Sequence, residues 1–159
     1  MCDILAMSFN KPVTVIFSLK RFMPRSTDID KDGWGLAWYP DKSAQIIKEH
    51  YSASESTLFV DLLKNVEIKS KIFILHFRRA SRGDVAHRNT HPFSRELFGR
   101  MYVFAHNGSL NSYRRLPTGR FRPIGETDSE HVFCHILPVS YTHLRAHETE
   151  ADLVCRLLL

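Results

Sequence analysis

The stretch Lys71-Ile72-Phe73-Ile74-Leu75-His76-Phe77 decides the fold, and Arg78 follows it directly. Its successive apolar residues would bury both faces of a strand, which predicts a central strand of a sheet over 71–77. Strand ends beside glycine turns hold binding groups on a rigid support, and Arg82-Gly83-Asp84 turns the chain soon afterwards. Because the Arg78 guanidinium can hold a carboxylate through two parallel hydrogen bonds, Arg78 is a candidate binding residue. A solvated charge at a strand end is the alternative interpretation.

The N-terminal residues predict a strand followed by a helix. Cys2 to Ser8 indicates a buried strand that Asn10-Lys11-Pro12 ends. Pro12 fits the first turn of a helix that reaches Met23. The expected core face of this helix consists of Val13, Ile16 and Phe17. The polar residues 24–32 then predict a loop.

The middle of the chain predicts a hairpin and a second helix. Two alternating runs, 33–39 and 44–49, flank the turn Pro40-Asp41-Lys42-Ser43, which is typical of a hairpin. Ser56 or Thr57 would cap a helix over 58–65. The expected apolar face of that helix consists of Leu58, Leu62 and Leu63.

The last part of the domain predicts one more strand and one more helix. Residues 99–106 contain an apolar run typical of a strand. Thr127 and Glu130 have the spacing of a capping box, which predicts a helix over 129–137. We expect Val132, Phe133 and Ile136 to face the core.

Asn107-Gly108 follows the strand predicted over 99–106 and tolerates the positive φ of a tight turn. A side-chain amide and a glycine N–H at a strand end can both point at a developing oxyanion, and such donors contribute roughly 2.7 to 4 kcal/mol each. A plain turn is the alternative. Asp128 could bind a substrate ammonium, although its place in the first helical turn explains it by itself.

Cys2 becomes the first residue once the initiator Met1 is removed, and it then carries a thiol and a free α-amine. That combination is a nucleophile with its own base. Removal of the methionine needs a small second side chain, which cysteine provides. The alternative interpretation of Cys2 is a small apolar residue that opens a strand.

Length and composition predict one packed domain. The 159 residues are 43% hydrophobic, enough for a domain that buries roughly 70% of its unfolded surface. The net charge of +5 is scattered and no nucleic-acid-binding signature is present, so we expect no nucleic-acid partner. Three widely spaced cysteines indicate a reducing, cytoplasmic compartment. No run reaches the length of a membrane span, and Val13–Leu19 lacks the basic flank of a signal peptide.

The spacing of several histidines permits a metal site as an alternative. His131, Cys134 and His135 could share one helical face, and His143 and His147 repeat the spacing, so a metal-binding module is an alternative prediction.

Residues 138–159 end in an apolar run without a helix stop signal. They resemble translated adaptor or vector sequence, and we interpret them as a tail outside the domain of residues 1–137, a sequencing or cloning artefact.

Six motifs, in this order, resemble the class II glutamine amidotransferases, the N-terminal nucleophile group, and most closely the stand-alone bacterial proteins with one glutaminase-type domain. The resemblance covers Met1 to about Leu137. The motifs are Cys2, Lys31-Asp32-Gly33-Trp34-Gly35, His76-Phe77-Arg78-Arg79-Ala80, Asn89-Thr90-His91-Pro92-Phe93, Ala105-His106-Asn107-Gly108 and Gly125-Glu126-Thr127-Asp128-Ser129-Glu130. Unrelated folds have no reason to share all of them in sequence.

The resemblance implies a role for each candidate residue. Cys2 would attack the side-chain amide of glutamine and form a γ-glutamyl thioester, while its α-amine accepts and returns protons. Asn107 and Gly108 would stabilise the oxyanion. Arg78 would bind the α-carboxylate of the substrate, and Asp128 its α-ammonium. Water would then release glutamate.

The same resemblance implies an α+β fold, the four-layer αββα sandwich of the N-terminal nucleophile hydrolases, with two antiparallel sheets between helical layers. Relatives continue beyond Leu137, so we expect a chain truncated at its C-terminus. We expect His76, His91 and His106 to be hydrogen-bonded supports rather than bases. No cofactor or metal is expected. The expected partners are glutamine or another γ-glutamyl small molecule, and a synthase or other acceptor of ammonia. A non-catalytic remnant that only binds glutamine is a further alternative.

Overall fold

The computed structural model describes residues 2–23, 31–65 and 67–145, so most of the loop predicted over 24–32 lies outside the described residues. The strands are β1 (Asp3–Thr14), β2 (Trp34–Trp38), β3 (Gln45–Glu49), β4 (Lys69–Phe77), β5 (Phe93–Leu97) and β6 (Arg100–Phe104). The α-helices are α1 (Ile16–Phe22), α2 (Thr57–Asn65) and α3 (Asp128–Arg145), and the short 3-10 helices are η2 (His87–Asn89) and η3 (Tyr113–Arg115).

β4 is an inner strand of a four-stranded antiparallel sheet with the order β1-β4-β2-β3. Its second half, Phe73–Phe77, is buried, which confirms the central strand predicted there. Phe77 pairs with Asp3 of β1 on one side and with Trp34 of β2 on the other. The starts of β1 and β2 therefore flank the end of β4, and this arrangement positions the candidate site.

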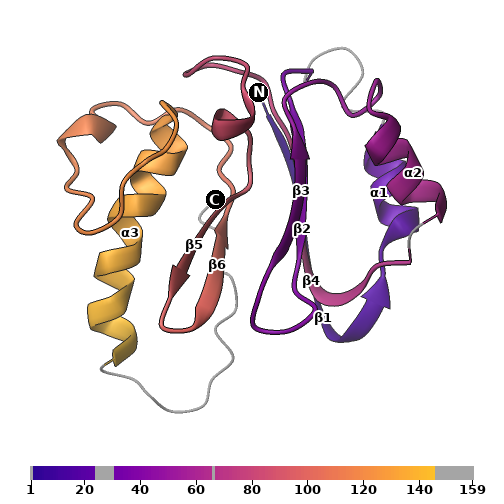
Figure 1. Ribbon diagram of the computed structural model, residues 1–159, viewed down its shortest axis with the longest axis horizontal. Helices are drawn as coiled ribbons and strands as arrows, with labels where there is room; N and C mark the ends of the chain where they lie inside the picture. The colour runs from indigo at the N-terminus through magenta and orange to yellow at the C-terminus, as the bar shows by residue number, and fades with distance from the viewer. Residues whose placement is uncertain (1, 24–30, 66, 146–159) are drawn as a thin grey trace.

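Three apolar clusters join the elements into successive layers. The first packs α1 and α2 on one face of the four-stranded sheet and includes Phe59 and Phe73. The second, on the opposite face, joins Ile74 of β4 to Val103 of β6. The third packs Phe133 of α3 against the β5–β6 hairpin. Helices α1 and α2, the four-stranded sheet, the hairpin and α3 thus follow one another across the molecule (Figure 1). The expected mixture of helices and antiparallel sheets is confirmed.

The boundary between β1 and α1 differs from the prediction. Pro12 lies within β1, where the pairing with β4 is irregular, so its missing N–H breaks no regular ladder. α1 begins only at Ile16, and Leu19 faces the core, whereas Phe17 is 78% exposed. β1 is half-buried or exposed rather than buried along its length, because it is the edge strand of the sheet.

The hairpin and the second helix follow the prediction closely. β2 and β3 pair directly, as the alternation indicates. The Ser56 Oγ accepts a hydrogen bond from the Phe59 N–H at 2.8 Å, so Ser56 is the N-cap of α2. One residue of the expected apolar face is wrong, since Leu58 is 41% exposed and Phe59 is fully buried beside Leu62 and Leu63.

β5 is a strand that the sequence does not predict. Its central residues are polar, and Arg95 uses its side chain to reach Glu130 of α3 at 2.5 Å. That contact also changes the expected capping box. The Glu130 N–H donates to the Thr127 Oγ1 at 3.2 Å, but the Glu130 carboxylate binds Arg95 and the Gly125 N–H instead of the cap. Only half of the capping box forms.

α3 extends past the predicted end, through Pro138 to Arg145. Phe133 faces the core with Leu137, as expected for Phe133, whereas Val132 and Ile136 are only half-buried. The division of the chain after residue 137 stays a prediction, and residues 146–159 lie outside the described residues.

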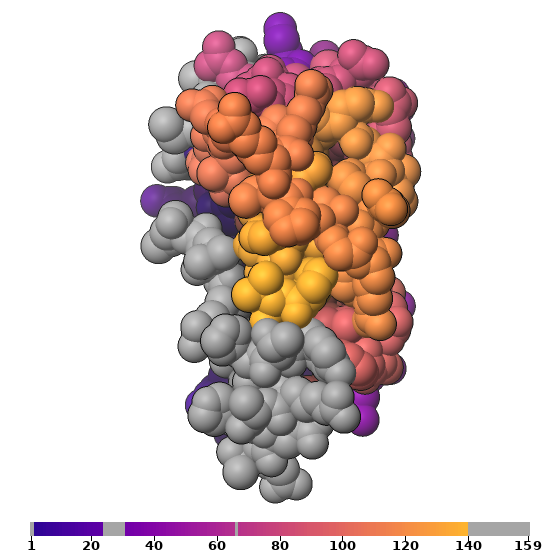
Figure 2. Space-filling model, turned by 90° about the vertical axis from the view of Figure 1, so that its left-hand side faces the viewer, coloured from indigo at the N-terminus to yellow at the C-terminus, as the bar shows by residue number. Residues whose placement is uncertain are grey.

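The segment that joins β6 to α3 covers the α3 side of the molecule. Figure 2 shows these residues, in orange, bordering the helix. Within the described ranges, no helix combines the length and the apolar character that crossing a membrane requires.

Candidate active site

Cys2 lies at the start of β1, beside the residues that follow β4. Continuing the register one step from Asp3 and Phe77 places Cys2 opposite Arg78. The Cys2 thiol donates to the Arg79 carbonyl oxygen at 3.3 Å, and the Arg79 backbone N–H donates to the Cys2 Sγ at 3.2 Å. The residue is only partly buried. Backbone contacts thus orient the thiol of this half-buried residue at the end of the sheet. Met1, whose removal we expect, lies outside the described residues.

Asn107, which follows the neighbouring hairpin, reaches the same point. The Asn107 Nδ2 donates to the Cys2 backbone carbonyl oxygen at 2.5 Å, across 105 positions of sequence. Gly108 has a φ of +149°, a backbone conformation that favours glycine. The structure therefore places the predicted amide donor directly beside the predicted nucleophile.

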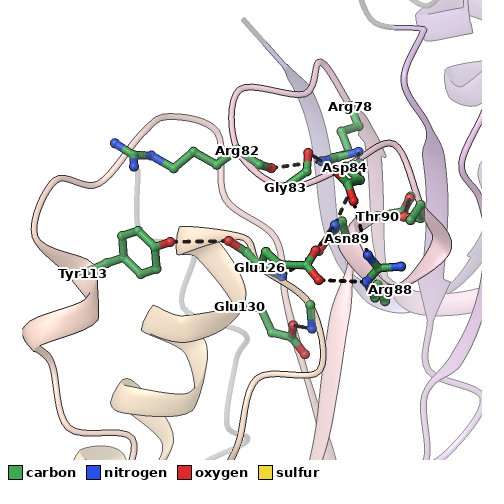
Figure 3. Close-up of polar contacts among 12 residues, drawn as sticks. Arg78, Arg82, Gly83, Asp84, Arg88, Asn89, Thr90, Tyr113, Glu126 and Glu130 are labelled. Atoms are coloured by element: carbon green, nitrogen blue, oxygen red, sulfur yellow. Dashed lines mark hydrogen bonds and ion pairs between the residues drawn. The ribbon is translucent and has the colours of Figure 1, made fainter.

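Arg78 is 2% exposed, so the alternative of a solvated charge is wrong. Its guanidinium donates to four backbone carbonyl oxygens, at distances between 3.1 and 3.5 Å. These belong to Asp32, Arg82, Gly83 and Asp84. Figure 3 shows the Arg78 side chain beside the loop that supplies three of them. We call this set of oxygens the carbonyl cradle.

The carbonyl cradle orients the guanidinium without neutralising it. Among the described residues, no carboxylate forms an ion pair with Arg78. Burial lowers the pKa of Arg78, and the nearby negative charges of Asp32 and of a Cys2 thiolate oppose that effect. The Asp32 carboxylate is held by the Ala80 N–H at 2.8 Å. A buried cation with neutral partners next to the thiol is suited to attract an anion.

Asp128 stands at the first turn of α3 and is 3% exposed. Its carboxylate accepts from the Leu110 N–H at 2.7 Å and from the Ser129 N–H at 2.9 Å. The Arg82 Nε lies 3.6 Å from the same carboxylate. Because Leu110 follows Asn107-Gly108, Asp128 ties the loop of the amide donor to the start of α3. It therefore does more than occupy the first helical turn.

The three motif histidines form a group in which His76 and His91 are buried and His106 is half-buried. The His76 Nε2 contacts the His106 carbonyl oxygen at 3.3 Å, and the His106 Nδ1 contacts the Ser129 Oγ at 3.0 Å. His91 stacks on His76 at 4.2 Å between ring centroids. Neither His91 ring nitrogen has a hydrogen-bond partner in the described part of the chain, so the expectation of a hydrogen-bonded support is wrong for His91. Burial lowers the pKa of His76 to about 3 and that of His91 well below its ordinary value, which suits neutral packing rather than base catalysis.

The residues of the alternative metal site serve other contacts. The His131 Nε2 lies 2.9 Å from the Leu116 carbonyl oxygen, and the His135 Nδ1 lies 2.7 Å from the Pro117 carbonyl oxygen. No group of three or more His, Cys, Asp or Glu side chains is arranged for a metal ion within the described ranges. The side chain of His143 and all of His147 are not described. The observed histidine contacts instead tie the loop before α3 to the helix.

Sequence reasoning gave no role to Arg82, Asn89 or Glu126, although the last two stand inside quoted motifs. Asn89 and Glu126 bond to each other across 37 positions, and Arg82 approaches Asp128 across 46. No pattern of neighbouring residues in the sequence predicts such long-range contacts. Only the folded chain shows that Asn89 and Glu126 lie close to the loop that holds Arg78 (Figure 3).

Comparison with known families agrees with this geometry. A sequence model described as "Glutamine amidotransferases class-II" matches residues 1–158. The chain belongs to the class II glutamine amidotransferases. This confirms the family resemblance of the motifs.

Similar members of the family include two bacterial proteins. "Putative glutamine amidotransferase YafJ" of Escherichia coli is 45% identical over 139 residues, which are 86% of this chain and 54% of that protein. "Putative glutamine amidotransferase" of Haemophilus influenzae is 37% identical over 155 residues, 96% of this chain and 52% of that protein. This amidotransferase chain thus spans about half the length of the curated relatives it matches.

A solved structure is similar as well. The crystal structure of a predicted glutamine amidotransferase from Pseudomonas aeruginosa superposes with a TM-score of 0.62 at 32% identity. The match covers 96% of this chain and 59% of the Pseudomonas chain. The amidotransferase fold is therefore shared over nearly all of the present chain.

Proposed function

We propose that this chain carries the glutaminase site of a class II glutamine amidotransferase, with Cys2 as an N-terminal nucleophile after removal of Met1. One observation carries the proposal. The start of β1, the end of β4 and the end of β6 converge, so the Cys2 thiol contacts the Arg79 backbone and the Asn107 amide contacts the Cys2 carbonyl oxygen. The proposed substrate is glutamine or another γ-glutamyl amide.

The reaction would begin with attack of the Cys2 sulfur on the side-chain amide carbon of the substrate. The thiol proton moves to the α-amine of Cys2, and the carbonyl oxygen becomes an oxyanion that Asn107 and Gly108 stabilise. The carbon–nitrogen bond then breaks, the amine returns its proton to the leaving nitrogen, and ammonia departs. Water attacks the remaining γ-glutamyl thioester, which releases glutamate and restores the thiol.

Two charged groups would hold the other end of the substrate. Arg78 would attract the α-carboxylate through its positive charge, because its terminal nitrogens are held by carbonyl oxygens and no carboxylate pairs with it among the described residues. Asp128 would bind the α-ammonium. An ammonium there would compete with Arg82, whose Nε lies 3.6 Å from the carboxylate.

We further propose that the observed layers are part of the four-layer sandwich of the N-terminal nucleophile hydrolases. The relatives are about twice as long, which supports a protein whose remaining part adds to these layers. The acceptor of ammonia would be a synthase or another partner. A cytoplasmic location also stays a prediction.

Covalent labelling tests the proposed nucleophile. The full-length gene product, with Met1 removed, is treated with a glutamine-mimicking diazo ketone and digested for mass spectrometry. We expect one adduct on Cys2 and loss of glutamate release, and Cys2→Ser should abolish both. Cys134→Ser is the matched control, because Cys134 is fully buried and burial raises its thiol pKa. Intact glutamine binding without an adduct or glutamate release would favour the non-catalytic remnant instead.

A further inference from the structure

Asn89 is a fully buried amide whose hydrogen-bonding groups are all used. Its Nδ2 donates to the Asp84 carbonyl oxygen at 3.1 Å and to the Glu126 Oε2 at 2.6 Å. Its Oδ1 accepts from the Glu126 backbone N–H at 2.8 Å. Figure 3 shows Asn89 between the loop of the carbonyl cradle and the residues that lead into α3. One side chain thus bridges two segments of the site.

One bridged segment holds the Arg78 guanidinium, and the other leads to Asp128. The Asp84 carbonyl oxygen accepts from both Asn89, at 3.1 Å, and the Arg78 guanidinium, at 3.2 Å. On the other side, Glu126 precedes Asp128 by two residues. A continuous path of short contacts therefore connects the proposed carboxylate site to the proposed ammonium site through Asn89.

Close packing leaves the Asn89 amide little freedom. A Cβ atom added at Gly125 would lie 2.1 Å from the Asn89 Oδ1, so only glycine permits this approach. On the opposite side, the same construction at Gly83 would lie 2.8 Å from the Asn89 Nδ2. The amide is therefore held from both sides. Because neither segment can move closer, the length of the Asn89 side chain sets the distance between them.

A second link between the segments is weaker because it is exposed. Arg88 contacts the Glu126 carboxylate at 3.0 Å and the Asp84 carboxylate at 3.5 Å, with 43% of its side chain exposed. Exposed ion pairs contribute little, whereas buried and fully satisfied hydrogen bonds are strong and orient their partners. Arg82 also belongs to the carbonyl cradle and approaches Asp128 at 3.6 Å, but its side chain is 39% exposed. Asn89 is the fully buried link of the three.

We propose that Asn89 is a positioning residue that sets the separation between Arg78 and Asp128 and thereby makes the site select α-amino-acid amides. The inference rests on the proposed function. The carboxylate and the ammonium of a γ-glutamyl substrate share one carbon atom, so both can be bound only when their two partners stand at the matching distance. An amide that carries just one of these groups makes no such demand.

Three amides distinguish this role from simple support of the fold. L-Glutamine carries both groups, glutaramate lacks the ammonium, and 4-aminobutanamide lacks the carboxylate. The assay measures kcat and KM for ammonia release from each, with the full-length, Met1-processed protein and its variants. The readout is the preference, defined as kcat/KM for glutamine divided by kcat/KM for each of the other amides.

Asn89→Asp keeps the shape of the side chain and its acceptor for the Glu126 N–H, but removes both donors. Asn89→Ala removes every contact, and Gly125→Ala displaces the intact amide. We expect each variant to lower the preference for glutamine about tenfold or more, mainly through KM, because a misplacement of about 1 Å can cost about a hundredfold. Arg88→Gln is the matched control and should keep the preference within about twofold, as expected for an exposed ion pair.

A loss of rate that is equal for all three amides, or an unchanged preference, would overturn the inference, since a merely structural role changes only the amount of active protein. Circular dichroism of each variant accompanies the kinetics, and the shape-conserving Asn89→Asp keeps the test available if Asn89→Ala does not fold. A wild-type protein that cleaves none of the amides would overturn the proposed function itself. That result is distinct from active protein with an unchanged preference.

Discussion

Replacing Arg78 by lysine separates the charge of this residue from its geometry. The guanidinium donates to the four oxygens of the carbonyl cradle, and a lysine ammonium has three N–H groups on a single nitrogen. We expect about two of these hydrogen bonds to be lost, which lowers the free energy of unfolding by about 2 kcal/mol at about 1 kcal/mol each. Lysine also replaces the planar guanidinium by a point charge on one nitrogen, and losing about 1.4 kcal/mol of attraction for the substrate carboxylate raises KM for glutamine about tenfold.

Two assays measure these effects on the full-length, Met1-processed protein. Urea denaturation gives the free energy of unfolding, and glutamate release at varied glutamine concentration gives KM and kcat. We expect kcat to change by less than about threefold, because the α-carboxylate is remote from the bond that breaks. Arg79→Lys is the matched control, since the Arg79 side chain is exposed and only its backbone contacts Cys2. A loss of stability with an unchanged KM would refute the carboxylate-binding role and leave Arg78 as a loop-organising residue.

Three other variants test the site and its scaffold. Asn107→Ala should lower kcat for glutamate release by about 100-fold to 1,000-fold, the effect of losing one oxyanion donor, with little change in KM. Ser56→Ala removes the cap of α2 and the contact of the Ser56 hydroxyl with the Glu49 carboxylate, which should lower the free energy of unfolding in urea by about 2 kcal/mol. Burial lowers the pKa of Lys48 from 10.5 to about 8, so between these two pH values the unfolded chain binds more protons than the folded chain. The unfolding free energy of the wild type should therefore rise relative to Lys48→Met as the pH increases from 8 to 10.5, by at most about 1 kcal/mol per pH unit.

Each of these predictions has a contrary outcome. An Asn107→Ala protein with the kcat of the wild type would exclude the oxyanion role of that amide. An unchanged urea midpoint for Ser56→Ala would show that neighbouring groups cap α2 without the hydroxyl. Parallel pH profiles for the wild type and Lys48→Met would show that Lys48 stays charged in the fold. Lys42→Met, at an exposed position, controls for the removal of one surface charge.

Local sequence patterns correctly predicted the strands and helices whose own residues indicate which face is buried. The apolar run over 71–77 became the inner strand β4, and the polar cap Ser56 began α2 as expected. The errors arose where neighbours decide the outcome. Pro12 fits a helix start equally well by itself, but the pairing of β1 with β4 continues on both sides of it. The polar Arg95 is not typical of a strand, and β5 is explained only by the ion pair of Arg95 with Glu130.

By itself, the sequence determined the central strand, the hairpin β2–β3, the capped helix α2 and the candidate residues at the ends of strands. These features depend on residues close together in the chain, where periodicity, turn residues and caps act. Tertiary structure alone decided that the Asn107 amide reaches Cys2 and that Arg78 is held by the carbonyl cradle. It also decided that Asn89 joins the two segments of the site. Such contacts join residues tens of positions apart, and their hydrogen bonds form only when the packed layers bring the backbone segments to the same place.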